Sequence, residues 1–317
     1  QRQMCIRDRW HLDKQWKDIK NFAKLCNVKL IGDLPFYVSW DSADVWSNKS
    51  LFSIFKNGAL IFQSGVPPDY FSSTGQLWGT PTYFWSKHKN TNFYWWRNRF
   101  KRQFELMDLL RLDHFRGLAG YWRVNGNSKT AISGKWISSP GRSLLSKLKF
   151  DLGTEYLPII AEDLGVITPD VEKLRKNFKL PGMKILQFAF DGNKDNPYLP
   201  RNINGENWVV YTGTHDNSTS MSWWDSLESN SKKRISDEYK FSEDPSWSLI
   251  EIGMKTDANL FIAPIQDILS LDDSSRLNIP GTTKNNWKWK LNRSLEEIED
   301  NIKIFSELGN NFGRTRN

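Results

Sequence analysis

Short apolar runs alternate along the chain with longer segments in which apolar residues recur every three or four positions. The short runs predict buried β-strands, and most of the longer segments between them predict amphipathic helices. Strands that are apolar on both faces are typical of a parallel sheet covered by helices. The candidate strands are residues 28–33, 109–113, 158–162, 183–190, 208–214 and 259–266.

Three segments carry helix signals. Residues 11–26 place apolar side chains at helical spacing on one face. The stretch Thr-Pro-Asp that begins at Thr168 is typical of a helix start, with a capping threonine, a proline in the first turn and an acid near the helix dipole. Ser294 and Glu297 predict a capping box for the last helix, which is expected to end at Gly309.

The candidate strand at 109–113 ends in ionisable residues, which a buried strand does not need. Because side chains alternate along a strand, Arg111 and Asp113 are expected on one face and Leu110 and Leu112 on the other. One interpretation is an ordinary structural ion pair. The other is that Arg111 and Asp113 face a functional pocket.

Acids stand at or just beyond the ends of four candidate strands: Asp33, Asp113, Glu162 and Asp216. In a (β/α)8 barrel the carboxyl ends of the strands face one pocket, so the acids are expected to converge. A doubly wound sheet would need a Gly-rich phosphate turn that the chain lacks. The predicted fold class is therefore α/β, an incomplete (β/α)8 TIM-type barrel with about six of its eight strands.

Composition narrows the classes of function. The 317 residues carry a net charge of +8, but lysine and arginine are scattered, which does not favour a nucleic-acid partner. No apolar run is long enough for a membrane span. The two cysteines show no metal-ligand or disulfide spacing, and they point to a reducing compartment. We therefore expect no membrane partner and no metal site.

Aromatic residues are unusually frequent, with 16 tryptophans. Residues 65–85 are rich in glycine, proline and aromatic side chains, and we interpret them as a long loop. The loop either packs over the core through its own aromatic rings or forms a lid on which sugar rings stack. Aromatic rings suit sugars because a sugar ring presents apolar C–H faces.

Three of the acids, Asp113, Glu162 and Asp216, are separated by 49 and 54 residues, about one strand, loop and helix each time. Cleavage of a glycosidic bond with retention needs one carboxylate nucleophile and one protonated carboxyl. Further negative charge stabilises the oxocarbenium-like transition state. The acids therefore predict glycosidic-bond chemistry.

Several long stretches resemble the 4-alpha-glucanotransferases, the amylomaltases or disproportionating enzymes of glycoside hydrolase family 77. The resemblance begins near Trp10 and follows the order of the family to the final helix. The matching stretches are IGDLPFYVSWDSADVW (31–46), GVPPDYFSSTGQLWG (65–79), RLDHFRGLAGYW (111–122), PIIAEDLGVITPDV (158–171), LPGMKILQFAFDG (180–192), YTGTHDN (211–217) and PGTTKNNWKW (280–289).

The resemblance implies Asp113 as the nucleophile, Glu162 as the general acid/base and Asp216 as the stabiliser of the transition state. Arg111 would keep Asp113 ionised, and His215 would hydrogen-bond the sugar. The remaining implied substrate-binding residues are Asp33, Asp69, Tyr70 and Trp78. Family members move 1,4-alpha-glucan segments, such as maltooligosaccharides, to the 4-hydroxyl of an acceptor glucan or glucose without a cofactor.

Two departures from the family pattern qualify the expectation. Thr80 occupies the usual position of an asparagine. Residues 1–9 resemble a foreign leader, and residues 10–317 resemble the C-terminal two thirds of the catalytic domain, without its first two strands. An open sheet would expose its edges, so we expect the isolated chain to be poorly soluble and weakly active or inactive.

Two other functions stay open from the residues: an alpha-glucan hydrolase of the same clan and a non-catalytic glucan-binding protein. A nucleic-acid binder rests on charge alone. The expected location is the cytoplasm, or a plastid if the source is a plant or alga.

Overall fold

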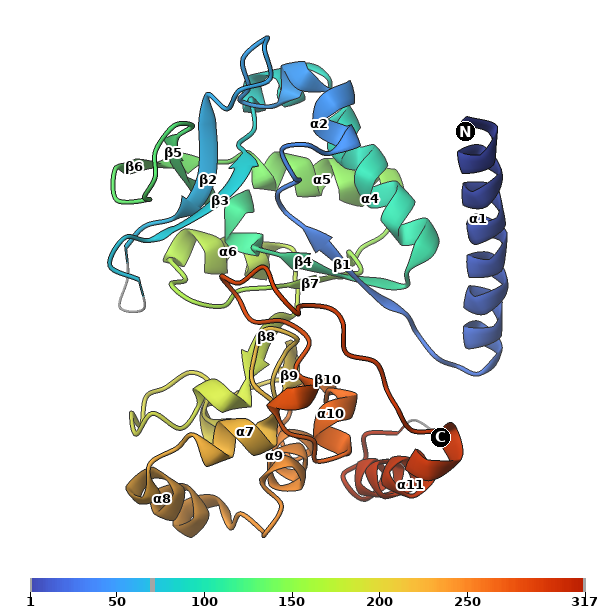
Figure 1. The fold of residues 1–317 in the computed structure, drawn as a ribbon, viewed down its shortest axis with the longest axis vertical. Coiled ribbons are helices and arrows are strands. Elements are labelled where there is room, and N and C mark those ends of the chain that lie inside the picture. The colour runs from blue at the N-terminus through green and yellow to red at the C-terminus, as the bar shows by residue number, and fades with distance from the viewer. Residues whose placement is uncertain (1, 69–71, 316–317) are drawn as a thin grey trace. The chain divides into compact units, whose positions relative to one another are not determined.

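The computed structural model describes residues 2–68 and 72–315. The chain divides into two units, Gln1–Pro181 and Gly182–Asn317, and most of their helices and strands are labelled in Figure 1. Each unit contains parallel strands and a hydrophobic core of its own.

The first unit contains three parallel strands in the order β1 (Ile31–Pro35), β4 (Leu109–Asp113) and β7 (Ile159–Ala161). The central strand β4 alternates as predicted, since Leu110 and Leu112 are fully buried on one face. The helices of this unit are α1 (Arg2–Leu25), α2 (Ala43–Ser47), α3 (Trp85–Asn90), α4 (Tyr94–Leu106), α5 (Gly141–Leu152) and α6 (Pro169–Asn177).

A second, antiparallel sheet corrects our interpretation of residues 65–85 as a loop. Its strands lie in the order β3 (Gln76–Pro81), β2 (Phe62–Val66), β5 (Gly120–Asn125) and β6 (Gly134–Ser138). The alternation was hidden because each strand contains a glycine, and at Gly65 on β2 the strands approach closely and the register shifts. A Cβ on Gly65 would lie 2.2 Å from the Gln76 carbonyl oxygen, so only glycine fits there.

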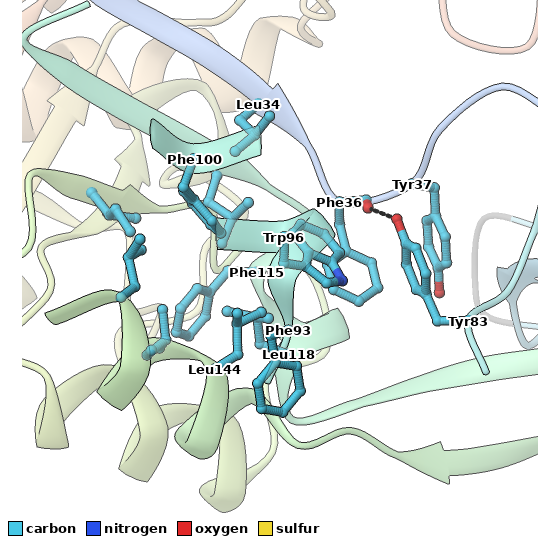
Figure 2. Close-up of a cluster of buried hydrophobic side chains, with 14 of the residues drawn as sticks. Leu34, Phe36, Tyr37, Tyr83, Phe93, Trp96, Phe100, Phe115, Leu118 and Leu144 are labelled. Atoms are coloured by element: carbon cyan, nitrogen blue, oxygen red, sulfur yellow. Dashed lines mark hydrogen bonds between the residues drawn. The ribbon is translucent and has the colours of Figure 1, made fainter. Parts of the chain in front are cut away.

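Aromatic side chains form much of the core of the first unit (Figure 2). Trp96 and Phe36 are fully buried, and their stacked rings lie 5.5 Å apart between centroids. The Tyr83 hydroxyl donates a hydrogen bond to the Phe36 carbonyl at 2.5 Å. Tyr83 and Trp85 are therefore core residues, as one of the two interpretations of the 65–85 segment predicted.

The predicted helix at 11–26 is longer than expected, since α1 begins at Arg2 and ends at Leu25. Trp16 donates a hydrogen bond from Nε1 to the Leu106 carbonyl at 2.9 Å. Much of the apolar face of α1 nevertheless stays exposed, with exposed fractions of 63%, 52% and 68% for Leu12, Ile19 and Phe22.

The second unit contains the parallel strands β8 (Gly182–Ile185), β9 (Trp208–Tyr211) and β10 (Leu260–Ile262), in that order. All three are shorter than the predicted apolar runs, because the chain continues into 3₁₀ turns, loops and helices that are also buried. The helices of this unit are α7 (Ser220–Asp225), α8 (Ser229–Tyr239), α9 (Pro245–Met254), α10 (Ile265–Ile268) and α11 (Leu295–Asn311).

The predicted capping box of the last helix is present, with Ser294 and Glu297 each bonding the other's backbone N–H. The predicted end at Gly309 is wrong, because α11 continues to Asn311. Gly309 is buried inside the helix. At the N-terminus of α6, Thr168 is the capping residue as predicted, but its hydroxyl accepts a hydrogen bond from Arg116 at 3.0 Å instead of capping the backbone.

Candidate active site

Arg111 joins two acids on the open face of the parallel strands of the first unit. Its guanidinium pairs with Asp33 at 2.6 Å and with Asp113 at 3.0 Å. The strand register sets Asp33 opposite Arg111, in the middle of β1 and not at its end as predicted. The side chains of Asp33 and Asp113 are 48% and 44% exposed, whereas Arg111 is 13% exposed. An anchored arginine with two accessible carboxylates suits a binding site better than a sealed structural ion pair.

Glu162 directly follows β7, and its carboxylate is held by backbone donors. The N–H groups of His114 and Leu164 donate to it at 2.7 and 3.1 Å. The Glu162 backbone also bonds to both sides of the β4 end, through the Leu112 carbonyl and the Phe115 N–H. The carboxyl group therefore has a fixed position beside the end of the strand that carries Asp113.

His114 makes this arrangement possible by adopting a left-handed conformation, with φ 52° and ψ 49°. The turn changes the chain direction between β4 and the 3₁₀ helix Phe115–Leu118 and leaves the His114 N–H bonded to Glu162. A left-handed non-glycine residue costs about 1–2 kcal/mol, which is consistent with a functional constraint. Burial, with a smaller effect of Arg116, lowers the pKa of the His114 side chain to about 4, so it is neutral near pH 7.

The pKa of Glu162 is raised to about 7. Burial of the carboxyl is the largest cause, and the nearby charge of Asp113 adds to it. Arg111 and the two backbone N–H groups act in the opposite direction and limit the rise. Glu162 can therefore hold a proton near neutral pH, as a general acid requires.

A cavity of about 830 Å³ opens beside Glu162 in the first unit. His114 and Trp78 line it, and their rings meet edge to face with centroids 4.9 Å apart. Trp78 is 36% exposed. The structure thus brings the predicted binding residue Trp78 into the same cavity as Glu162. Asp69 and Tyr70 lie outside the described residues. Thr80, the departure from the family pattern, bonds the Ser64 hydroxyl at 2.5 Å.

Asp216 and His215 follow β9 in the second unit. Their side chains meet, with His215 Nε2 3.3 Å from Asp216 Oδ2. The His215 ring lies 5.1 Å from the ring of Trp287. Asn278 donates from Nδ2 to Asp216 Oδ1 at 2.5 Å, and Arg276 donates to the Asp216 carbonyl at 2.7 Å.

The sequence did not indicate that Asn278 and Arg276 contact Asp216. They lie about sixty positions after Asp216 in sequence, in a segment that forms no helix or strand. The only available signal was polar side chains next to the PGTTKNNWKW stretch. Arg276 also donates to the Asn278 carbonyl at 2.9 Å, a bond within the segment.

The described residues contain no group of three or more His, Cys, Asp or Glu side chains that could hold a metal ion. Within the same residues, no helix has the length and apolar character needed to cross a membrane.

Comparisons with known proteins identify the family of the chain. Residues 3–296 match the model of the 4-alpha-glucanotransferase family, glycoside hydrolase family 77. The 4-alpha-glucanotransferase of Synechocystis sp. is 46% identical over 280 residues, which are 87% of this chain and 55% of that protein. The chloroplastic/amyloplastic 4-alpha-glucanotransferase of Arabidopsis thaliana is 43% identical over 315 residues, 98% of this chain and 54% of that protein.

A solved structure, the amylomaltase from Streptococcus agalactiae in complex with acarbose, is similar with a TM-score of 0.90 and 35% sequence identity. The similarity covers 96% of this chain and 61% of that one. It confirms the predicted α/β class and the incomplete barrel, of which the described residues contain six parallel strands. The chain spans about half the length of the curated relatives it matches.

Proposed function

The chain belongs to the 4-alpha-glucanotransferase family, and on this premise we propose that its acids transfer 1,4-alpha-glucan segments to acceptor glucans or glucose with retention of configuration. The observation that carries the proposal is that two neighbouring carboxyl groups have different environments. Asp113 is ion-paired with Arg111 at 3.0 Å, and the neighbouring Glu162 has a pKa of about 7. A retaining enzyme needs this combination of a charged nucleophile and a protonated acid.

In the first step, an Asp113 oxygen attacks the anomeric carbon of the donor glucan. The bond from that carbon to the glycosidic oxygen breaks, and Glu162 gives its proton to that oxygen, which leaves as the 4-hydroxyl of the departing sugar. The product is a glucosyl ester on Asp113. In the second step, the 4-hydroxyl of an acceptor attacks the ester while the Glu162 carboxylate takes its proton. Asp113 is then released as a carboxylate, and the acceptor is longer by one segment.

The other residues support these steps. Asp216 supplies a further carboxylate that stabilises positive charge on the sugar ring, and His215 binds the same sugar. Arg111 offsets the negative charge of Asp113 and of Asp33. Trp78 offers an accessible ring for stacking against a sugar beside Glu162.

Incubation of the whole protein with maltotriose tests the proposal. We expect glucose together with maltooligosaccharides longer than maltotriose, and NMR of the early products should show the α configuration at each new bond. Shortening without elongation would overturn the proposal in favour of a hydrolase. Binding of maltotriose without any product would favour a glucan-binding protein.

The rate of the first step should fall as pH rises through about 7, because only the protonated form of Glu162 can act as the acid. We expect kcat/KM for the donor to decrease about tenfold per pH unit above that pKa. The measurement is a pH profile of kcat/KM with a maltooligosaccharide donor. A rate that stays constant for two pH units above about 7 would contradict the assignment of Glu162 as the acid.

Replacing Asn278 with alanine should lower kcat/KM about 10- to 100-fold, since a hydrogen bond to a charged group contributes roughly 1.5–3 kcal/mol. The variant loses the donor that fixes Asp216 Oδ1. Asn204→Ala is the matched control, because Asn204 is an exposed asparagine of the same unit whose side chain bonds only a local carbonyl. Equal activities of the two variants would show that Asn278 does not position Asp216.

A further inference from the structure

The cavity beside Glu162 extends well beyond that carboxyl. Besides Glu162, its lining includes Arg116 and Trp136, residues of the Gly165–Val166 turn and the start of α6. At about 830 Å³ it falls in the upper part of the range of small-molecule sites, roughly 300–1,000 Å³. Asp113 and Arg111 are not among its lining residues in the described part of the chain.

The position of Glu162 indicates which sugar of the substrate this cavity accommodates. The general acid must contact the glycosidic oxygen, and that oxygen leaves with the departing sugar. The nucleophile instead contacts the anomeric carbon of the sugar that stays. A cavity lined by the acid but not by the nucleophile therefore accommodates the leaving sugar in the first step and the acceptor in the second. The inference rests on the proposed function, since it uses the roles of both acids.

Trp136 is the lining residue with the features of a sugar-binding platform. It lies on β6 and is 47% exposed, although tryptophan usually buries its large apolar ring. Trp122, its cross-strand partner on β5, meets the Trp136 ring edge to face with centroids 5.4 Å apart. Trp122 is itself anchored by a hydrogen bond from Nε1 to the Ala131 carbonyl at 2.8 Å. The exposed ring therefore stands on a rigid sheet.

Arg116 is held against Trp136. The centre of its guanidinium lies 4.1 Å from the ring centroid, and Nη2 donates to the Thr168 hydroxyl at 3.0 Å. Its Nε is buried without a hydrogen-bond partner in the described residues. The pair combines a planar apolar surface with cationic N–H donors. A glucan chain presents the complementary features, apolar ring faces and hydroxyl oxygens.

We propose that Trp136, supported by Arg116, is a specificity-determining residue that binds the second and later rings of an acceptor glucan. In this assignment the acceptor ring next to Glu162 contacts Trp78 and His114, and the following ring contacts Trp136. The site then favours acceptors of at least two glucose units over glucose itself.

The test is the acceptor dependence of Trp136→Ala in the whole protein, with a fixed donor and with glucose or maltotriose as acceptor. We expect the acceptor KM for maltotriose to rise about 3- to 10-fold, in keeping with the energy of one ring contact. The KM for glucose and both kcat values should be unchanged. Trp136→Tyr should restore most of the affinity for maltotriose because it retains a ring. Trp46→Ala is the control, since Trp46 is 75% exposed in the same unit and does not line the cavity.

Three results would overturn the inference. They are an unchanged KM for maltotriose, an equal rise of KM for both acceptors, and a loss of kcat for both acceptors that Trp136→Tyr does not restore. Transfer by the unmodified protein distinguishes failure of this inference from failure of the proposed function. Absence of transfer to any acceptor would refute the proposed function, whereas normal transfer without the length dependence would refute only the role of Trp136.

Discussion

Replacing Glu162 with glutamine is expected to lower the rate of glucan transfer by about 10²- to 10⁴-fold, the usual contribution of a positioned general acid. The backbone N–H groups of His114 and Leu164 donate to different oxygens of the present carboxylate, at 2.7 and 3.1 Å. The single oxygen of glutamine can keep only one of these bonds, because its NH2 group is a donor. Glutamine cannot deliver a proton to the leaving oxygen. The loss should therefore appear in kcat/KM with little change in the fold.

A donor with a good leaving group tests the cause of this loss. Fluoride leaves from an α-glucosyl fluoride with little need for acid, so the first step of Glu162→Gln should be largely spared with that donor. Single-turnover rates with maltotriose and with the fluoride measure the difference. Glu155→Gln is the control, because Glu155 is an exposed glutamate paired with Lys179 in the same unit. An equal loss with both donors would show that Glu162 does not act as the acid.

Trp96→Ala should destabilise the first unit by about 3–5 kcal/mol, the usual cost of removing a fully buried large aromatic side chain. Trp96 is fully buried, and its ring lies 5.5 Å from Phe36 and 5.9 Å from Phe100. Trp96→Phe should cost less, because Trp96 Nε1 has no hydrogen-bond partner among the described residues and phenylalanine keeps a ring in place.

Urea unfolding of the two variants, followed by circular dichroism, measures this difference. The exposed Trp46→Ala serves as the reference and should change the free energy of unfolding by at most about 0.5 kcal/mol. If Trp96→Ala were no more destabilising than that reference, the packing around Phe36 would contribute little to stability.

The sequence was sufficient to predict strands and their faces where the local pattern of apolar residues matches the pattern of burial. The alternation of Leu110 and Leu112 with Arg111 and Asp113 predicted the faces of β4, because one face packs against the core. The six parallel strands were predicted for the same reason, although their ends were not. An apolar run continues past the strand when the following turn is buried as well, as in the 3₁₀ helix Leu186–Phe188 after β8.

The antiparallel sheet and the surroundings of Asp216 depend on contacts between residues that are far apart in the sequence, which a local pattern does not reveal. In β2 and β3, glycines replace the apolar residues that would mark a strand, because the two backbones approach closely at Gly65. Asn278 reaches Asp216 across 62 residues, and nothing in the spacing of either residue indicates the other. The roles given to Asp113, Glu162 and Asp216, and to Asp33, Asp69, Tyr70 and Trp78, are predictions.

The left-handed backbone of His114 limits which amino acids can occupy that position. Glycine and asparagine adopt this conformation readily, whereas valine and isoleucine crowd the backbone and disfavour it. A library of all substitutions at this position, selected for folded protein, should therefore retain glycine and asparagine and lose the β-branched residues. During evolution, few single substitutions of His114 are therefore expected to preserve the backbone contact with Glu162.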